Sequence, residues 1–261
     1  IRLSLVGSEM CIRDSILPTL SKSDVSLANI TPRERYRALN DAFAEARGGA
    51  PYELRIQGSD ELHTEHDSLM LESCNTSFQV HLQVEPDEFA LLYNAAQLVT
   101  APVLAAAVNS PVLFGKLLWD ETRIALFQQS IDTRRGATHM RDVSPRVRFG
   151  EEWLAEGLMD LVREDVTRFR VLLTRDVTED PIALLDAGGA PSLQALALHN
   201  GTVYRWNRPC WGVLDGVAHL RIECRVLPSG PTIVDEVANA AFWIGSVLGA
   251  ADEYGDVRQQ M

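Results

Sequence analysis

The chain has 261 residues, of which 46% are hydrophobic and 23% are charged, as is typical of a folded globular protein. This length suits one large domain or two small ones. The net charge of −12 argues against a general nucleic-acid-binding protein, which would show a basic face, but it does not exclude a local basic pocket for an anion. Apart from Lys22 and Lys116 the basic residues are arginines, which suit a bidentate grip on carboxylate or phosphate.

Residues 1–15, IRLSLVGSEMCIRDS, lack the long apolar core and small-residue cleavage site of a secretory signal. They are similar to a peptide that results when sequencing-adapter DNA is translated, SLVGSEMCIRD. We therefore expect residues 1–15 to be an artefactual or disordered tail and residues 16–261 to form the folded domain. The alternative is a natural, poorly ordered terminus. On the first interpretation the natural start of the domain is missing, and the chain is an internal fragment.

The N-terminal half predicts a helix followed by two strands. Thr31-Pro32 is a helix-start signal, and Gly48-Gly49 is a stop signal. Residues 52–57 alternate between apolar and polar side chains, as a half-buried strand does. Residues 77–84 alternate in the same way, with apolar side chains at the even-numbered positions.

Pro86 begins a long apolar segment that ends near Asn109 and that we predict to be a helix. Residues 89–108 carry no charge and are long enough to span a bilayer. Asn94, Thr100 and the absence of basic flanks argue against a span. We expect a helix buried inside the domain and no membrane partner.

The C-terminal half predicts a helix around residues 150–173, then a strand pair or a strand running into a loop over 193–206. A strand over 219–228 and a helix over 231–254 follow. This order lacks the regular strand–helix alternation of a parallel sheet. It predicts an α+β fold in which helices cover the apolar face of an antiparallel sheet.

Four cysteines occur in the chain, with no spacing typical of structural zinc: Cys11, Cys74, Cys210 and Cys224. Cys74 and Cys224 lie in strand-like sequence, and we expect them to be reduced, buried thiols. Such cysteines favour a cytoplasmic protein. Because none has an activating base beside it in the sequence, we do not expect a cysteine nucleophile.

Three predicted strands carry polar faces that are rich in Arg, Gln and His and contain no Lys. A solvated face is the commoner explanation for any one antiparallel strand. We nevertheless expect these faces to combine into one concave surface that binds anions and a metal. The side chains concerned are Glu53, Arg55, Gln79, His81, Arg221, Glu223 and Arg225.

Five segments, in their order and spacing, resemble the glutamate–cysteine ligase type 2 family of carboxylate–amine ligases. The resemblance covers residues 16–261. It rests on ILPTLSKSD, CNTSFQVHLQVEPDEFALLYNAAQLVTAPVLAAAVNSPVLFG, LWDETRIALFQQSIDTRR, LHNGTVYRWNRPCWG and HLRIECRVLPSGPTIVDEVANAAFWIG.

The resemblance implies a curved antiparallel sheet similar to that of glutamine synthetase, with its N-terminal part missing here. The polar concave face of such a sheet binds ATP, a divalent metal (Mg²⁺ or Mn²⁺) and an amino acid. The implied reaction begins when the γ-carboxylate of glutamate attacks the γ-phosphate of ATP. The amine of cysteine then attacks the acyl phosphate and forms a γ-glutamyl bond.

The family's QVH strand implies that Gln79 and His81 contact the metal–phosphate end of ATP, with His81 as a metal ligand. The ExR strand implies that Glu223 is a second metal ligand. It also implies that Arg225 binds phosphate or substrate carboxylate and takes part in catalysis. The alternatives are a core histidine at position 81 and a surface ion pair between Glu223 and Arg225. Residues two apart on a strand share a face, which favours the site.

The segment HNGTVYRWNRP implies substrate contacts for His199, Thr202 and Arg208. Arg208 is the best candidate for gripping a carboxylate, and we assign it a catalytic role beside Arg225. The alternative for Arg208 is stacking on a neighbouring tryptophan.

Arg123, in LWDETR, is a further candidate for substrate binding. Its alternative is an ion pair with Asp120 on a helix surface. The cluster HTEHD, residues 63–67, is rich in metal-binding side chains, but neighbours this close in sequence do not converge on one ion without a tight turn. We expect a polar loop there.

The family also has two acidic residues, in an ExE arrangement, on an early strand, and this pair has no counterpart before ILPTLSKSD. Mg²⁺ prefers oxygen ligands, and Glu223 is the one good candidate. We therefore expect an incomplete metal site, little ligase activity in the isolated polypeptide, and an unpaired sheet edge.

Two alternatives for function stay open. One is a ligase with a different amine acceptor, and the other is a non-catalytic homologue that binds an amino acid or nucleotide. In each case the expected partners are small molecules, and the sequence does not indicate an oligomeric state.

Overall fold

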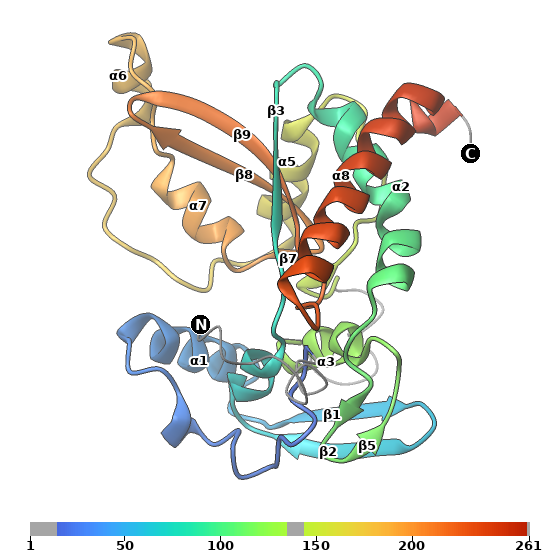
Figure 1. The fold of residues 1–261 in the computed structure, drawn as a ribbon. Helices are drawn as coiled ribbons and strands as arrows, with labels where there is room; N and C mark the ends of the chain where they lie inside the picture. The colour runs from blue at the N-terminus through green and yellow to red at the C-terminus, as the bar shows by residue number, and fades with distance from the viewer. Residues whose placement is uncertain (1–14, 135–143, 260–261) are drawn as a thin grey trace. The chain divides into compact units, whose positions relative to one another are not determined.

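The structure is a computed structural model that describes residues 15–134 and 144–259. The chain forms two compact units, each built from separate stretches of sequence. Of the described residues, the first unit comprises 15–78, 102–134, 144–147 and 226–242, and the second comprises 79–101, 148–225 and 243–259. Helices and antiparallel strands occur in both units (Figure 1), which confirms the α+β fold class.

Of the expected tail, only Ser15 is among the described residues; residues 1–14, with Cys11, lie outside them. Ser15 is buried in the first unit, and its backbone N–H donates to the carbonyl of Asn109 at 2.8 Å. Ser15 therefore belongs to the folded unit, next to the buried Ile16.

The first unit packs short helices against a hairpin of two strands. Its core contains Leu54, Ile56, Leu71, Leu113 and Leu126. The elements that lie wholly within it are η2 (Leu27–Asn29), α1 (Glu34–Ala46), β1 (Tyr52–Gln57), β2 (Glu61–His66), η3 (Leu69–Cys74), β4 (Val112–Leu113), β5 (Lys116–Leu117) and α3 (Thr122–Ser130).

Two predictions about the first unit are wrong. The polar loop expected over residues 63–67 is mostly strand: residues 63–66 belong to β2, which pairs with β1 along its whole length. β1 and β2 form a separate two-stranded sheet. Glu53 and Arg55 on β1 therefore do not share a sheet with Glu223, contrary to the expected single polar surface. They form exposed ion pairs across the hairpin instead, with His63 and Glu61.

The second unit is built around a three-stranded antiparallel sheet in the order β3 (Val80–Val84), β9 (Val217–Cys224), β8 (Asn207–Leu214). β8 and β9 form a long arched ribbon in Figure 1. Asp215 and Gly216 join them as a two-residue turn, both with positive φ (52° and 78°), which is the pattern of a type I′ hairpin. The other elements wholly within this unit are α5 (Leu158–Arg168), α6 (Pro181–Asp186), α7 (Gln194–Asn200), β7 (Tyr204–Arg205) and η4 (Val257–Gln259).

One face of this sheet is apolar and packs on helix α2 (Phe89–Ala107), which continues into the first unit after residue 101. Ile222 and Cys224 are fully buried there. Asn207, paired with Cys224, donates to the hydroxyl of Thr100 on α2 at 2.8 Å. The hydroxyl of Tyr93, also on α2, donates to the carbonyl of Asn207 at 3.0 Å. This confirms the prediction of a helix on the apolar face.

Helix α8 (Ile233–Tyr254) also runs from one unit into the other. In length and composition both α2 and α8 could cross a membrane, but core helices of soluble proteins pass the same test. In the apolar 18-residue stretch of each helix, 44% of the residues of α2 and 17% of those of α8 are buried. Most of α8 thus lies at the surface of the described structure.

Residues 193–206 form helix α7 and the short strand β7 rather than the predicted strand pair. The prediction that Cys74 lies on a strand is wrong, because Cys74 ends helix η3. Cys224 lies on β9 as predicted and is buried. β6 (Val147–Arg148) lies beside β7. In the described part of the chain, Cys74, Cys210 and Cys224 are free cysteines; Cys224 is buried as expected, whereas Cys74 is only half-buried.

Candidate functional site

The second face of the β3–β9–β8 sheet is polar and is centred on Glu223. The register places His81 on β3 and Arg208 on β8 directly opposite Glu223 on β9. Residues directly opposite each other in antiparallel strands share a face, so these three side chains meet. The sequence predicted the His81 and Glu223 strands, but it did not predict that Arg208 lies on a strand.

The carboxylate of Glu223 is 2% exposed and contacts three cationic or basic groups. Its Oε2 accepts from Arg208 Nε at 2.7 Å, and Arg225 Nε lies 3.8 Å from the same oxygen. His81 Nε2 lies 3.4 Å from Oε1. We call Glu223, His81, Arg208, Arg225 and Arg221 the Glu223 cluster.

The Glu223 cluster has a surplus of positive charge, because it contains three arginines and one carboxylate. Burial lowers the pKa of His81, and although Glu223 opposes this, the net pKa lies below the ordinary histidine value. His81 is therefore neutral at pH 7. Burial also lowers the pKa of Arg208, but the charge of Glu223 outweighs it and raises the pKa above its ordinary value. The surplus suits a bound anion.

Arg221 supplies an unsatisfied donor on the same face. It stands two residues from Glu223 on β9 and opposite both Gln83 and Cys210. Its Nε is buried, and no described residue accepts a hydrogen bond from it. A buried donor without a partner costs about 1–3 kcal/mol, so an anionic ligand that accepts from it would bind more tightly.

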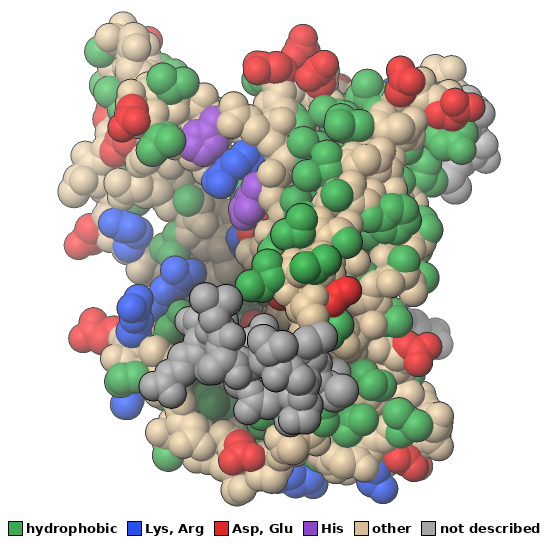
Figure 2. Space-filling view, in the orientation of Figure 1, with side chains coloured by type: hydrophobic (Ala, Val, Ile, Leu, Met, Phe, Trp, Pro, Cys, Tyr) green, Lys and Arg blue, Asp and Glu red, His purple; other side chains and the backbone are tan. Residues whose placement is uncertain are grey.

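Farther along the face, Gly212 lies opposite His219. A Cβ at position 212 would lie 2.5 Å from His219 Nε2, so glycine leaves the space that the imidazole occupies. Figure 2 shows histidine and arginine or lysine side chains reaching the surface in the part of the molecule formed by these strands.

Gln79 is exposed and stands one position before β3, and the structure gives its side chain no contact with the Glu223 cluster. Arg225 stacks above Tyr204, with its guanidinium carbon 5.6 Å from the ring centroid. Its backbone N–H donates to the carbonyl of Trp206 at 2.8 Å. These contacts hold Arg225 beside Glu223.

His199 and Thr202 lie together at the end of α7, in a different part of the second unit's hydrogen-bond network. Thr202 Oγ1 donates to the carbonyl of His199 at 2.9 Å. His199 Nε2 lies 3.2 Å from the carbonyl of Asp165 on α5. These bonds join Thr202 to His199 and join His199 to the backbone of α5.

A buried charge network anchors α5 to β7, and the sequence did not predict it. Arg205, 1% exposed, donates from Nη2 to Asp165 at 2.7 Å and to Glu164 at 2.7 Å. Arg148 pairs with Glu164 from the other side. Although burial raises the pKa of Glu164, the two arginines hold it below its ordinary value. The charged residues along α5 do not indicate in the sequence that Glu164 and Asp165 pair with an arginine, because Arg205 comes from a distant segment, β7.

Arg123 lies in the first unit, where it is 2% exposed at the start of α3. Its Nε donates to Glu121 at 2.7 Å, and its Nη2 donates to the carbonyl of Val226. The expected alternative, a surface pair with Asp120, is wrong because the side chain is buried. The structure gives Arg123 a packing role in the first unit.

Cys210 lies beside the Glu223 cluster, although the sequence analysis did not include it among the site residues. Its Sγ lies 3.8 Å from Glu223 Oε2, and its thiol, the Glu223 carboxylate and a ring nitrogen of His81 lie within 4.8 Å of one another. Burial raises the pKa of Cys210, and Glu223 adds to the effect. The thiol therefore holds its proton more tightly than an ordinary cysteine does.

These three donors do not make the oxygen-rich site that Mg²⁺ prefers. They offer one carboxylate, one imidazole and one thiol, and the carboxylate already accepts a hydrogen bond from Arg208. The cluster as described fits an anionic group such as phosphate or carboxylate better than it fits a magnesium ion.

A family model described as glutamate-cysteine ligase family 2 matches residues 14–258. The matched range contains the whole Glu223 cluster and nearly all of both units. The chain matched no curated protein and no solved structure.

Proposed function

The chain belongs to glutamate–cysteine ligase family 2, whose members are carboxylate–amine ligases, and we propose that it joins glutamate to an amine at the expense of ATP. Cysteine is the first candidate for the amine, with γ-glutamylcysteine as the product. The free cysteines of the described residues suit a reducing compartment, so we place this activity in the cytoplasm.

One observation carries the proposal: two arginines and a histidine contact the buried carboxylate of Glu223, and a third arginine, Arg221, lies two residues away on the same face of β9. The Arg208–Glu223 bond of 2.7 Å fixes one guanidinium, and the stacking of Arg225 on Tyr204 fixes another. Fixed cations need little reorganisation when charge develops near them. The arrangement supports binding of two anionic reactants side by side.

The chemistry we propose needs such cations and no protein nucleophile. A carboxylate oxygen of glutamate bonds to the γ-phosphorus of ATP, and the bond to the bridging oxygen breaks, which releases ADP. The amine nitrogen then bonds to the acyl carbon, inorganic phosphate leaves, and the amine loses a proton. Positive charge near the first step offsets the repulsion between the carboxylate and the phosphate.

Within this scheme Arg208 and Arg225 bind and neutralise the reacting phosphate or carboxylate. Gln79 and His81 contact the phosphate end of ATP, and neutral His81 donates or accepts one hydrogen bond. His199, Thr202 and Arg123 are proposed substrate contacts that would have to exchange a protein partner for the ligand. They are weaker candidates, because their described partners are protein groups.

The family generally uses ATP with Mg²⁺, and the proposed metal ligands here are His81 and Glu223. For Glu223 to bind an ion, its carboxylate would have to turn away from Arg208. Further oxygen ligands would have to come from outside the described cluster or from ATP itself. A bound divalent ion would neutralise phosphate charge, and no step above depends on it.

Two other functions stay open as alternatives. In the first, the same carboxylate activation serves an amine other than cysteine. In the second, the cluster binds an amino acid or nucleotide without turnover, as in a regulatory homologue. Both use the same cationic face, so turnover and acceptor identity distinguish them.

An ADP-release assay with glutamate, ATP and a panel of amines tests the proposal. Glutamate labelled with ¹⁸O in its side-chain carboxylate gives a second readout, because acyl-phosphate chemistry transfers one labelled oxygen to inorganic phosphate. Because the Glu223 cluster supplies a single carboxylate for a metal, we expect slow ADP release from this polypeptide, and we expect that release to need both glutamate and an amine. ADP release without label in the phosphate would exclude the mechanism.

Arg208→Gln and Arg55→Gln form a matched pair of variants for this assay. Loss of the Arg208 charge should lower kcat/KM about 100-fold, the size expected for removing one preorganised charged donor. Arg55 pairs with Glu61 on the exposed hairpin, and its loss should change kcat/KM less than about twofold. Tight ATP and glutamate binding without any ADP release would favour the non-catalytic homologue.

A further inference from the structure

Three different metal-binding side chains meet on the polar face of the β3–β9–β8 sheet, one from each strand. His81 stands on β3, Glu223 on β9 and Cys210 on β8. A ring nitrogen, a carboxylate oxygen and the thiol sulfur lie within 4.8 Å of one another. The proposed ligase chemistry uses His81 and Glu223 but gives the thiol of Cys210 no role.

The separations of these donor atoms suit one tetrahedral ion. His81 Nε2 lies 3.4 Å from Glu223 Oε1, and Cys210 Sγ lies 3.8 Å from Glu223 Oε2. Around a tetrahedral zinc ion, with bonds of about 2.0–2.3 Å, neighbouring ligand atoms lie roughly 3.3–3.6 Å apart. The three donors would therefore have to approach one another by about 1 Å, a shift that side-chain rotation supplies while the strands stay paired.

The donor set favours a thiophilic ion such as Zn²⁺ over Mg²⁺. Zinc binds cysteine sulfur, histidine nitrogen and carboxylate oxygen, and many of its sites have three protein ligands and one open position. Mg²⁺ prefers an octahedron of oxygen ligands, to which a thiol adds nothing. Cys210 is thus the residue that distinguishes a zinc site from a magnesium site on this face.

Burial decreases inward from the surface in a way that suits an ion entering from solvent. The side chain of His81 is 35% exposed, Cys210 is half-buried, and the side chain of Glu223 is 3% exposed. An ion can therefore contact the imidazole first and then the two ligands behind it. Because all three ligands stand on paired strands of the second unit, the backbone holds them in place.

The arginines of the Glu223 cluster oppose a dication, and two effects offset them. Coordination replaces the thiol proton of Cys210 with the metal, so the proton goes to solvent and the ligand becomes an anion. The fourth position on the ion is open to a further anion. Arg208 can pair with that anion once the Glu223 carboxylate turns from Arg208 toward His81 and Cys210.

We propose that His81, Cys210 and Glu223 bind one Zn²⁺ ion, with an anion or water in the fourth position. This inference goes beyond the proposed ligase function, and the binding stands without it. In the proposed ligase, the ion would occupy the two residues assigned to the phosphate end of ATP and would act as an inhibitor. That consequence alone rests on the proposed function.

Zn²⁺, Co²⁺ and Mg²⁺ are the probes, added to the full chain without ATP or glutamate. Calorimetric titration measures affinity and stoichiometry. Co²⁺ in place of zinc gives an ultraviolet charge-transfer band when a thiolate binds it, and intense visible bands when it is four-coordinate. We expect both Co²⁺ signals, and Mg²⁺ binding at least about 100-fold weaker than Zn²⁺ binding. Equal affinities, or zinc binding without the thiolate band for Co²⁺, would overturn the proposal.

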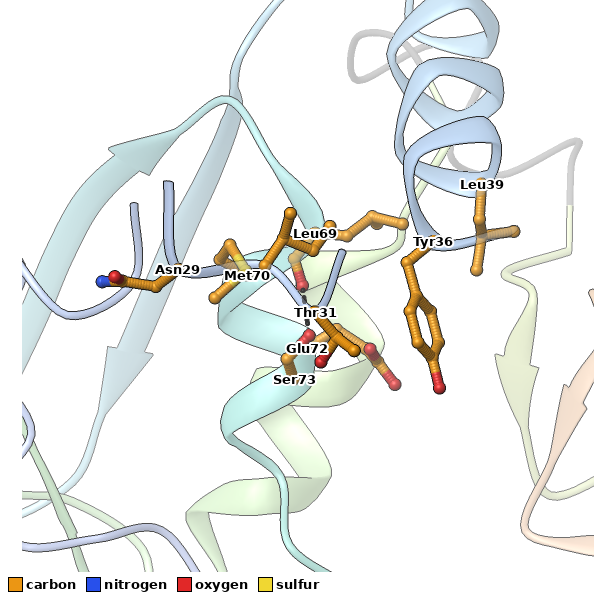
Figure 3. Close-up of a pocket in the computed structure, with 9 residues that line it drawn as sticks. Asn29, Thr31, Tyr36, Leu39, Leu69, Met70, Glu72 and Ser73 are labelled. Atoms are coloured by element: carbon orange, nitrogen blue, oxygen red, sulfur yellow. Dashed lines mark hydrogen bonds between the residues drawn. The ribbon is translucent and has the colours of Figure 1, made fainter. Parts of the chain in front are cut away.

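Cys210→Ser and Cys74→Ser form the first matched pair, because each removes one half-buried thiol. Cys74 ends η3, which forms one wall of the 400 Å³ pocket in Figure 3, and its thiol donates to the carbonyl of Met70 at 3.2 Å. Cys210→Ser should abolish the thiolate band and weaken zinc binding at least about 100-fold, the upper end for a residue that only supports a ligand. Cys74→Ser should change neither. Equal effects of the two substitutions would overturn the proposal.

His81→Gln and His63→Gln form the second matched pair. Each histidine faces a glutamate across paired strands, with His81 Nε2 at 3.4 Å from Glu223 and His63 Nε2 at 2.6 Å from Glu53. The thiol of Cys210 lies beside the first of these pairs. His81→Gln should weaken zinc binding at least about 100-fold, and His63→Gln should leave it unchanged. Similar affinities in both variants would place the ion elsewhere and overturn the proposal.

A double variant, Cys11→Ser with Cys74→Ser, keeps the test decisive even if Cys210→Ser does not fold. It retains Cys210 and Cys224, and Cys224 is fully buried on the opposite, apolar face of the sheet. The thiolate band should persist, and its loss would assign the sulfur ligand to another cysteine and overturn the proposal. Circular dichroism checks that each variant is folded. No turnover is measured, so a failed ligase assay does not affect this test, and a failed titration does not affect the ligase proposal.

Discussion

Glu223 is a buried carboxylate whose neighbours are mostly cationic, and this explains both its position and its sensitivity to substitution. At 2% exposure it could not stay ionised without partners. Arg208 at 2.7 Å, Arg225 at 3.8 Å and His81 at 3.4 Å provide them. The same carboxylate holds the arginines at fixed positions on the polar face. The residue therefore contributes to stability and to the proposed chemistry at once.

Replacing Glu223 with Gln should destabilise the protein by about 3 kcal/mol, because it leaves Arg208 largely buried without its counter-ion. Urea unfolding at pH 7 measures this. Glu61→Gln is the control, since Glu61 pairs with Arg55 at the surface and its loss should cost less than about 1 kcal/mol. Similar losses in the two variants would mean that the Glu223 cluster is solvated like a surface pair.

His81 should make stability depend on pH in a specific direction. Its pKa in the folded protein lies below its ordinary value of about 6.5, chiefly because of burial. Between these two values the unfolded chain binds more protons than the folded one, so the free energy of unfolding rises with pH. The stabilisation is present above pH 6.5 and is lost as pH falls through the folded-state pKa.

Unfolding curves from pH 5 to pH 7.5 for the wild type and His81→Gln check this, and the variant should show a shallower dependence in that range. Histidine ring signals in NMR give the pKa directly. A folded-state pKa above the ordinary value would contradict the sign, and would mean that Glu223 outweighs both burial and the neighbouring arginines.

At the scale of single elements, alternation and helix-end signals predicted the longest helices and three of the strands. The predicted strand over 52–57 matches β1, and the predicted helix ending at 254 matches α8. The helices expected over 31–49 and 150–173 are shorter, as α1 and α5. These segments have long, regular apolar patterns, in which periodicity is most informative.

The wrong predictions fall on short segments, where neighbours in space decide the structure. QALALHN, which became α7, is a nearly continuous apolar run, and its Ala, Leu and Gln residues favour a helix. β2 has one buried residue, Leu62, and is a strand because β1 pairs with it. β8 contains Pro209 and Gly212, which discourage a strand assignment, but proline is tolerated because β8 is an edge strand.

The bidentate pair of Arg205 with Asp165 links β7 to α5, so Asp165→Asn should loosen that helix. We expect a loss of about 3–5 kcal/mol in the free energy of unfolding, because the buried Arg205 loses one of its two carboxylate partners. Urea unfolding and amide exchange along α5 measure it. Glu156→Gln, which breaks an exposed pair with Arg163, should cost less than about 1 kcal/mol. Faster exchange in both variants alike would contradict the assignment.

At the scale of the whole molecule, each unit is assembled from segments that are far apart in sequence. The sheet of the second unit pairs residues near 80 with residues near 220, so this unit needs most of the chain in order to fold. This long-range pairing also limited what the sequence could predict about the site. Alternation indicated which residues share a face of one strand, but not that β1 pairs elsewhere or that Arg208 and Cys210 join Glu223.

Phase partitioning in a cloud-point detergent tests the expectation that the protein does not insert into membranes. Asn94 on α2 exchanges two hydrogen bonds with the backbone of Leu154, at 3.0 and 2.9 Å, and these would be lost in a lipid-facing helix. We expect the protein in the aqueous phase. Asn94→Leu, which removes both bonds, should cost about 2 kcal/mol of stability and still leave the protein there. Recovery of the wild type in the detergent phase would contradict this interpretation of α2.

The two-residue connection at Asp215 and Gly216 has a consequence for anyone who engineers or compares this protein. The connection fixes which residues of β8 and β9 face each other. One amino acid inserted there would shift this pairing by one residue and turn β8 over. Arg208 and Cys210 would then point toward the apolar core, and Pro209 and Trp211 would point toward the polar face. Such an insertion would disrupt both folding and the proposed chemistry, although it lies away from the Glu223 cluster. In related sequences, a change in the length of this turn should therefore indicate lost function more reliably than a substitution within β8 or β9.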